Sequence, residues 1–191
     1  LANSRYYPAP HASIATRDDF VGIRGGRILE HVSKVMTWHG GNGEAVFNTG
    51  IARRSANGAF AGLVSVALRR SYFESFYREL LGNERGAMTL MLARTDVAVL
   101  ASYPGGSGSA MAPRELAAAL AHGSRSGVLR TAGEDGRREP RGGRILAYRQ
   151  VGAYPVYVSC AYSEAAIWTA WYKRALVSAA SIFVPSIVLW F

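Results

Sequence analysis

The sequence has little cysteine and little lysine. Cys160 is the single cysteine among 191 residues, which excludes an internal disulfide framework and a zinc site built from cysteines. Lys34 and Lys173 are the lysines among 22 basic residues, and the others are arginine. Walker loops, HExxH motifs and Gly-x-Ser-x-Gly elbows are absent, and the four histidines share no ligand spacing. We therefore expect a non-enzymatic segment with no metal and no cofactor.

The composition is that of a globular protein with an excess of positive charge. The chain is 49% hydrophobic and 18% charged, its net charge is +9 and its pI is about 10.1. Such a charge raises nucleic acid as a partner. However, the densest arginine cluster, within residues 137–144, is interspersed with acidic residues and contains no aromatic side chains for base stacking. The sequence therefore predicts no nucleic-acid binding.

One long uncharged run stands out at the C-terminal end. Residues 175–191 carry no charge and follow Lys173-Arg174, whereas a spanning helix needs about 20 apolar residues. Trp171 and Tyr172 precede the run, where an aromatic interfacial belt would lie. We interpret residues 171–191 as the start of a transmembrane helix in a piece of a longer membrane protein. The alternative is a buried C-terminal helix of a soluble domain.

The first 84 residues read as strands followed by a helix. Turn signals separate β-rich runs at 28–38, 44–52 and 60–68, which predicts antiparallel hairpins. The spacing Ser71-x-x-Glu74 predicts a capping box at the start of a helix. The apolar residues of that helix predict one buried face: Phe73, Phe76, Tyr77 and Leu80.

A second unit repeats the order of strands and helix. Its predicted elements are strands at 87–92 and 97–102, a helix at 113–121, a hairpin at 144–162 and a final helix capped by Ser163. We therefore predict an α+β fold of two tandem units with antiparallel sheets. The predicted boundaries are 1–84, 85–170 and 171–191.

Several segments, in this order, resemble a known family. They include Ser4 to Pro10, Arg17-Asp18-Asp19-Phe20, Val46-Phe47-Asn48 with Arg53-Arg54, Ser71 to Tyr77, and Tyr154 to Val158. Together they resemble double Cache sensor domains, which consist of two tandem PAS-like modules. The resemblance covers nearly the whole chain, with the distal module truncated at its N-terminus.

The resemblance implies an extracytoplasmic sensor of a receptor in the bacterial inner membrane. Such a sensor lies in the periplasm, binds a small molecule, forms a homodimer and relays a conformational change to a cytoplasmic output domain. A histidine kinase is the expected output, with a diguanylate cyclase or a chemoreceptor as the alternative. A module that only dimerises or binds a periplasmic protein is the rival interpretation.

The candidate ligand site lies in the first unit. Arg17 offers planar donors to a carboxylate, and Asp18 or Asp19 would accept an amine. Aromatic walls and further polar groups complete the set: Tyr6, Tyr7, Trp38, Asn48 and Arg53. The ligand classes are organic acids, amines and amino acids, although Asp19 replaces an aromatic residue that is frequent in amino-acid-binding relatives. Alternatively, Arg17 and Asp18 pair with each other on the surface.

Overall fold

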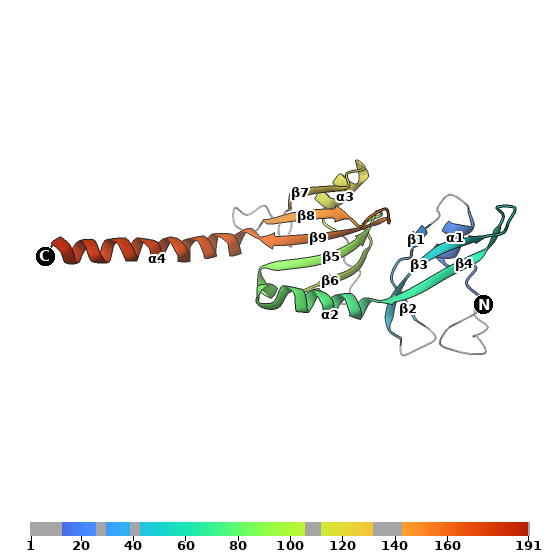
Figure 1. Ribbon diagram of the computed structural model, residues 1–191, viewed down its shortest axis with the longest axis horizontal. Helices are drawn as coiled ribbons and strands as arrows, with labels where there is room; N and C mark the ends of the chain where they lie inside the picture. Colours follow the sequence, from blue (N-terminus) through green and yellow to red (C-terminus); the bar gives the residue numbers. More distant parts are fainter. Residues whose placement is uncertain (1–12, 26–29, 39–42, 106–111, 132–142, 191) are drawn as a thin grey trace.

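Two antiparallel sheets follow one another along the molecule, and a long helix extends beyond the second (Figure 1). The computed structural model describes residues 13–25, 30–38, 43–105, 112–131 and 143–190. Strands within residues 30–69 form the first sheet, and strands within residues 88–163 form the second sheet. The predicted α+β class with antiparallel sheets is confirmed.

The first sheet is built around one long central strand. Its strands are β1 (Glu30–Val32), β2 (Met36–Thr37), β3 (Ala45–Arg54) and β4 (Phe60–Arg69). β1 and β2 pair with one edge of β3, and β4 pairs with the other. The predicted single strand at 28–38 is therefore wrong: β1 and β2 are separated at Ser33, whose hydroxyl accepts a hydrogen bond from the Asn48 amide of β3 at 2.8 Å.

Helix α1 (Asp18–Arg24) packs on one face of the first sheet. Ile23 is completely buried there. A Cβ atom at Gly50 of β3 would lie 2.6 Å from Leu63 Cδ1 and 3.4 Å from Ile23 Cδ1. Glycine at this position therefore leaves space chiefly for the Leu63 side chain of β4, with Ile23 of α1 beside it.

Helix α2 (Arg70–Leu81) continues directly from β4, and the turn η1 (Gly82–Gly86) follows it. The predicted capping box is wrong, because the Ser71 hydroxyl donates to the Glu44 carboxylate at 2.6 Å, while Glu74 accepts a bond from Arg70 at 2.6 Å. The predicted apolar face is also shifted around the helix. Tyr77 and Leu81 are buried, with Phe73 half-buried beside them, whereas Phe76 and Leu80 are exposed.

The second sheet has five strands in the order β6-β5-β9-β8-β7. The strands are β5 (Met88–Arg94), β6 (Val99–Tyr103), β7 (Ser126–Thr131), β8 (Arg144–Gln150) and β9 (Val156–Ser163). Strand β7 was not predicted, but the hairpin of β8 and β9 was. Helix α3 (Arg114–Ala121) begins after Pro113 and buries Leu116 and Leu120 in a cluster with side chains of this sheet.

The two sheets share a hydrophobic core. Val32 and Phe47 of the first sheet are buried in one cluster with Tyr77 of α2 and with Leu92 and Leu100 of the second sheet. The Phe47 ring lies 5.3 Å from the ring of Phe73 on α2. Apolar contacts therefore hold the first sheet against α2 and the second sheet.

Helix α4 (Glu164–Trp190) leaves the end of β9 and projects away from both sheets (Figure 1). The final helix is thus where the sequence predicts it. Its exposed aromatic residues Trp168, Trp171 and Tyr172 contact one another, with ring centroids 5.1–6.2 Å apart. Among the residues that the structure describes, no helix combines the length and the apolar character needed to span a membrane.

Candidate ligand-binding site

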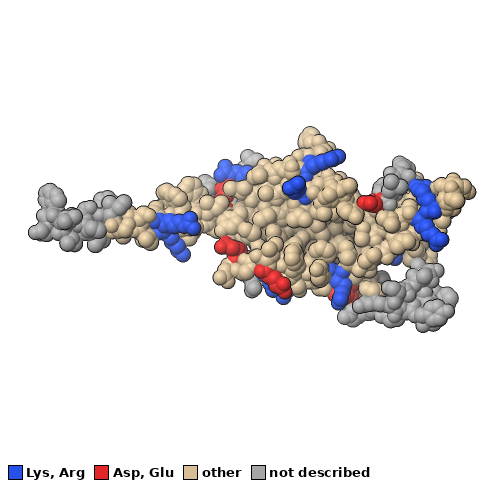
Figure 2. All heavy atoms as spheres, in the orientation of Figure 1, with Lys and Arg blue, Asp and Glu red and all other residues tan. Residues whose placement is uncertain are grey.

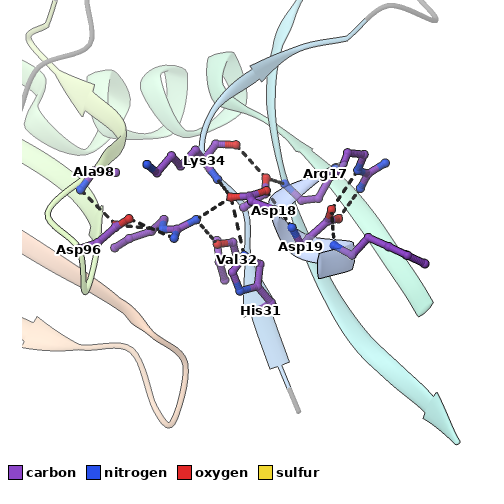
Figure 3. A network of polar contacts seen from close by, with 12 residues as sticks. Arg17, Asp18, Asp19, His31, Val32, Lys34, Asp96 and Ala98 are labelled. Carbon is purple, nitrogen blue, oxygen red and sulfur yellow. Dashed lines mark hydrogen bonds and ion pairs between the residues drawn. The ribbon is translucent and has the colours of Figure 1, made fainter. Parts of the chain in front are cut away.

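Asp18 lies at the start of α1, where the first sheet meets a turn of the second sheet (Figure 3). Its Oδ2 atom accepts hydrogen bonds from the Lys34 backbone amide at 3.0 Å and from Arg94 Nη1 at 3.1 Å. The His31 Nε2 atom lies 3.7 Å from the same oxygen. The Asp18 side chain is 36% exposed and therefore in contact with solvent.

The pKa of Asp18 lies below its ordinary value of 3.8. Partial burial acts in the opposite direction and raises it, but hydrogen bonds from the Lys34 amide and Arg94, with the charges of Arg94 and His31, outweigh the burial. Asp18 is therefore an anionic acceptor at neutral pH.

Arg17 and Asp19 form an internal ion pair. Arg17 donates from Nε to Asp19 Oδ1 at 2.9 Å and from Nη2 to Asp19 Oδ2. The Asp19 side chain is completely buried and also accepts the Phe20 amide at 2.9 Å. Asp19 thus takes the two-pronged contact that a ligand carboxylate would need from Arg17. The alternative pairing of Arg17 with Asp18 is not found; the partner of Arg17 is Asp19.

Three of the remaining predicted site residues lie elsewhere in the first sheet or directly beside it. Asn48 is buried in β3, and its side-chain amide faces Met36 Sδ at 3.7 Å. Trp38 is half-buried at the end of β2, and Arg53 is exposed near the end of β3 together with Arg54. Tyr6 and Tyr7 lie outside the described residues.

Two residues near Asp18 were not among the predicted site residues. Arg94, at the end of β5, lies 76 positions from Asp18 in the sequence, and its side chain is 14% exposed. His31 on β1 is 12% exposed, and its Nε2 atom is buried without a hydrogen-bond partner in the structure. The local signal for Arg94 is its pairing with Asp96 two residues later, within a predicted turn.

The surface around α1 contains an open recess, and the charged side chains of the molecule are dispersed. An open recess of about 360 Å³ lies beside α1, lined by Ala15, Phe20, Val21, Arg24 and Gly25. Lys and Arg side chains form separate groups on the visible face of the molecule, with Asp and Glu between them (Figure 2). Among the residues described, no three acidic, histidine or cysteine side chains gather as metal ligands.

Comparison with known proteins identifies the fold. No protein-family model matches the chain, and no curated protein matches it. A solved structure described as the extracellular domain of a histidine kinase, rpHK1S-Z16, matches with a TM-score of 0.65 and 23% identity over 85% of this chain and 66% of that one. This chain has the fold of an extracytoplasmic sensory domain.

Two chemoreceptor structures show the same sensory-domain fold. The periplasmic sensory domain of the Campylobacter jejuni chemoreceptor Tlp1 matches with a TM-score of 0.59 and 14% identity, over 78% of this chain and 56% of that chain. The ligand-binding domain of the Pseudomonas aeruginosa amino acid chemoreceptor PctB, in complex with L-Arg, matches with a TM-score of 0.56 and 13% identity, over 95% and 68%. This chain spans 66% of the length of rpHK1S-Z16 and 56% of that of Tlp1, which is less than two thirds of each.

Proposed function

We propose that this chain is the ligand-sensing region of a bacterial transmembrane receptor with a double Cache architecture. The sensory-domain fold and the order of the family-like segments support this function. In this proposal residues 1–84 form the distal module, which binds the ligand. Residues 85–170 form the membrane-proximal module, and α4 relays the change toward a cytoplasmic output domain.

The ligand class that the geometry favours is a cationic amine. The observation that carries this choice is the Asp18 carboxylate, which is 36% exposed. Its Oδ1 atom accepts the Asp19 amide at 2.8 Å, and its Oδ2 atom accepts the Lys34 amide and Arg94. Arg17 is paired with the completely buried Asp19, which disfavours simple organic acids as ligands. The PctB domain was solved in complex with L-Arg, whose amino and guanidinium groups carry positive charge.

A thermal-shift screen of the 191-residue chain tests the proposal. We expect amines to raise the melting temperature by roughly 5–10 °C at 100 times the dissociation constant. The shift in melting temperature should disappear in Asp18→Asn. It should persist in the control variant Glu84→Gln, which changes the net charge by the same amount but lies in η1. The absence of a shift with amines, amino acids and organic acids alike would contradict ligand sensing. An equal shift in Asp18→Asn would exclude Asp18 as the binding group.

The receptor context belongs to the same proposal. The charge-free residues 175–191 and the exposed aromatic group on α4 support attachment to the bacterial inner membrane, with the sensor in the periplasm. A histidine kinase is the favoured output domain, and a diguanylate cyclase or chemoreceptor is the alternative. A fusion of alkaline phosphatase after residue 163 tests the orientation, because the enzyme is active only when it is exported.

A dimerisation module is the second candidate function. The observation that favours it is an exposed apolar stripe on α2, where Tyr72, Phe76 and Leu80 are 68%, 49% and 64% exposed at helical spacing. Sedimentation velocity of the chain and of Phe76→Glu distinguishes the two functions. A dimer that Phe76→Glu dissociates, together with no ligand in the thermal screen, would favour this candidate.

A further inference from the structure

We infer that Arg94 is a clasp that fixes the orientation of the first sheet relative to the second. Its guanidinium donates to three residues from two parts of the molecule: Asp96, Asp18 and Val32. Nε and Nη2 donate to the two carboxylate oxygens of Asp96 at 3.0 and 3.1 Å. Nη1 donates to the Val32 carbonyl at 2.6 Å and to Asp18 Oδ2 at 3.1 Å.

The turn between β5 and β6 holds the clasp in position. The Asp96 carboxylate accepts hydrogen bonds from Nε and Nη2 of Arg94. The remaining nitrogen, Nη1, is therefore directed at the first sheet. The turn closes with bonds from the Val97 amide to the Arg94 carbonyl at 3.0 Å and from the Arg94 amide to the Ala98 carbonyl at 2.9 Å. Arg94 is therefore anchored to the second sheet by both its backbone and its side chain.

The shared core holds the sheets together through apolar contacts. The cluster that contains Val32, Phe47 and Leu100 is apolar, and hydrophobic contact has no preferred direction. The hydrogen bonds of Arg94 are directional and reach both α1 and β1. The directional bonds of Arg94 therefore add a restriction on the relative orientation of the two sheets to the contacts of the core.

The contact between Arg94 and the first sheet depends on the charge of Asp18. One oxygen atom, Oδ2, accepts both Arg94 and the Lys34 amide, and it faces His31 as well. Loss of the Asp18 charge weakens one of the two hydrogen bonds from Arg94 Nη1 to the first sheet, because that bond is strengthened by the opposite charges of the two groups. The equilibrium between two arrangements of the sheets then shifts. This device requires no particular ligand and goes beyond the proposed sensing function.

Pulsed electron paramagnetic resonance tests the clasp in the full chain. Spin labels at Ala61→Cys on β4 and Ala147→Cys on β8, both exposed positions, report the distance between the sheets in a Cys160→Ala background. We expect one narrow distance distribution in this background. Its width should roughly double, or a second distance should appear, in Arg94→Gln and in Asp18→Asn.

A matched variant separates the clasp from a general loss of charge. Arg130→Gln breaks the Arg130–Glu164 pair, which joins β7 to α4 and does not contact the first sheet. We expect this variant to leave the distance distribution unchanged. Asp18→Asn acts from the first sheet and retains the side-chain shape, so its result stands even where Arg94→Gln unfolds the chain. An unchanged distribution in folded Asp18→Asn overturns the inference, as does equal broadening in Arg130→Gln.

Discussion

The Asp18–Arg94 contact predicts a measurable energetic coupling between the two sheets. The perturbation is a double-mutant cycle of Asp18→Asn, Arg94→Gln and the double variant. Asp18 is 36% and Arg94 14% exposed, so solvent screens the pair partially, and we discount it to about 1 kcal/mol. Arg94→Gln also loses the bond to the Val32 carbonyl and the two-pronged contact with Asp96, which brings its total cost to about 2–3 kcal/mol.

The assay is urea unfolding at pH 7 for the four proteins of the cycle. We expect the double variant to be destabilised by about 1 kcal/mol less than the sum of the single variants. The coupling should weaken as salt is added, because part of it is electrostatic. Additivity of the two single changes within about 0.3 kcal/mol would refute the reasoning.

Three further predictions concern the pH dependence, the shared core and the β5–β6 turn. Because the pKa of Asp18 is lowered in the folded chain, its stabilising contribution is present above about pH 4 and lost as the pH falls through the lowered value. Acid unfolding curves of Asp18→Asn should lack this component. Phe47→Ala should cost about 3–5 kcal/mol in urea unfolding, with the fluorescence and circular dichroism transitions shifting together, because the residue is 2% exposed within the core that joins both sheets. Separate transitions would show that the core is not shared. Val97 adopts a φ of 60°, which costs a β-branched residue about 1–2 kcal/mol, so Val97→Gly should destabilise by at least about 1 kcal/mol less than Val99→Gly on the neighbouring strand. Equal costs would argue against backbone strain at Val97.

Local patterns were sufficient for most of the strands and helices. Turn residues and period-two alternation locate β3, β4, β8 and β9 because adjacent antiparallel strands leave local signals. The failures have tertiary causes. Ser71 bonds to Glu44 across the chain instead of capping its own helix, and the core that forms around Tyr77 and Leu81 buries a different stripe of α2.

The candidate site was only partly predictable. Arg17, Asp18 and Asp19 are neighbours in the sequence, but their pattern does not reveal which carboxylate pairs with the arginine. Burial decides it, since Asp19 is completely buried and requires a charge partner, whereas Asp18 points toward the second sheet. Arg94 could not be assigned to the site because the contact depends on how two sheets pack, which no local pattern encodes.

Hydrogen exchange on the ligand-saturated chain tests the central claim most directly. The ligand is the amine that gives the largest thermal shift, and amides are followed segment by segment. We expect added protection in α1, in β1 and at Lys34, whose amide bonds to Asp18. We also expect changed protection in the β5–β6 turn, which carries Arg94. Protection confined to the second sheet and α3, with α1 and β1 unchanged, would contradict it.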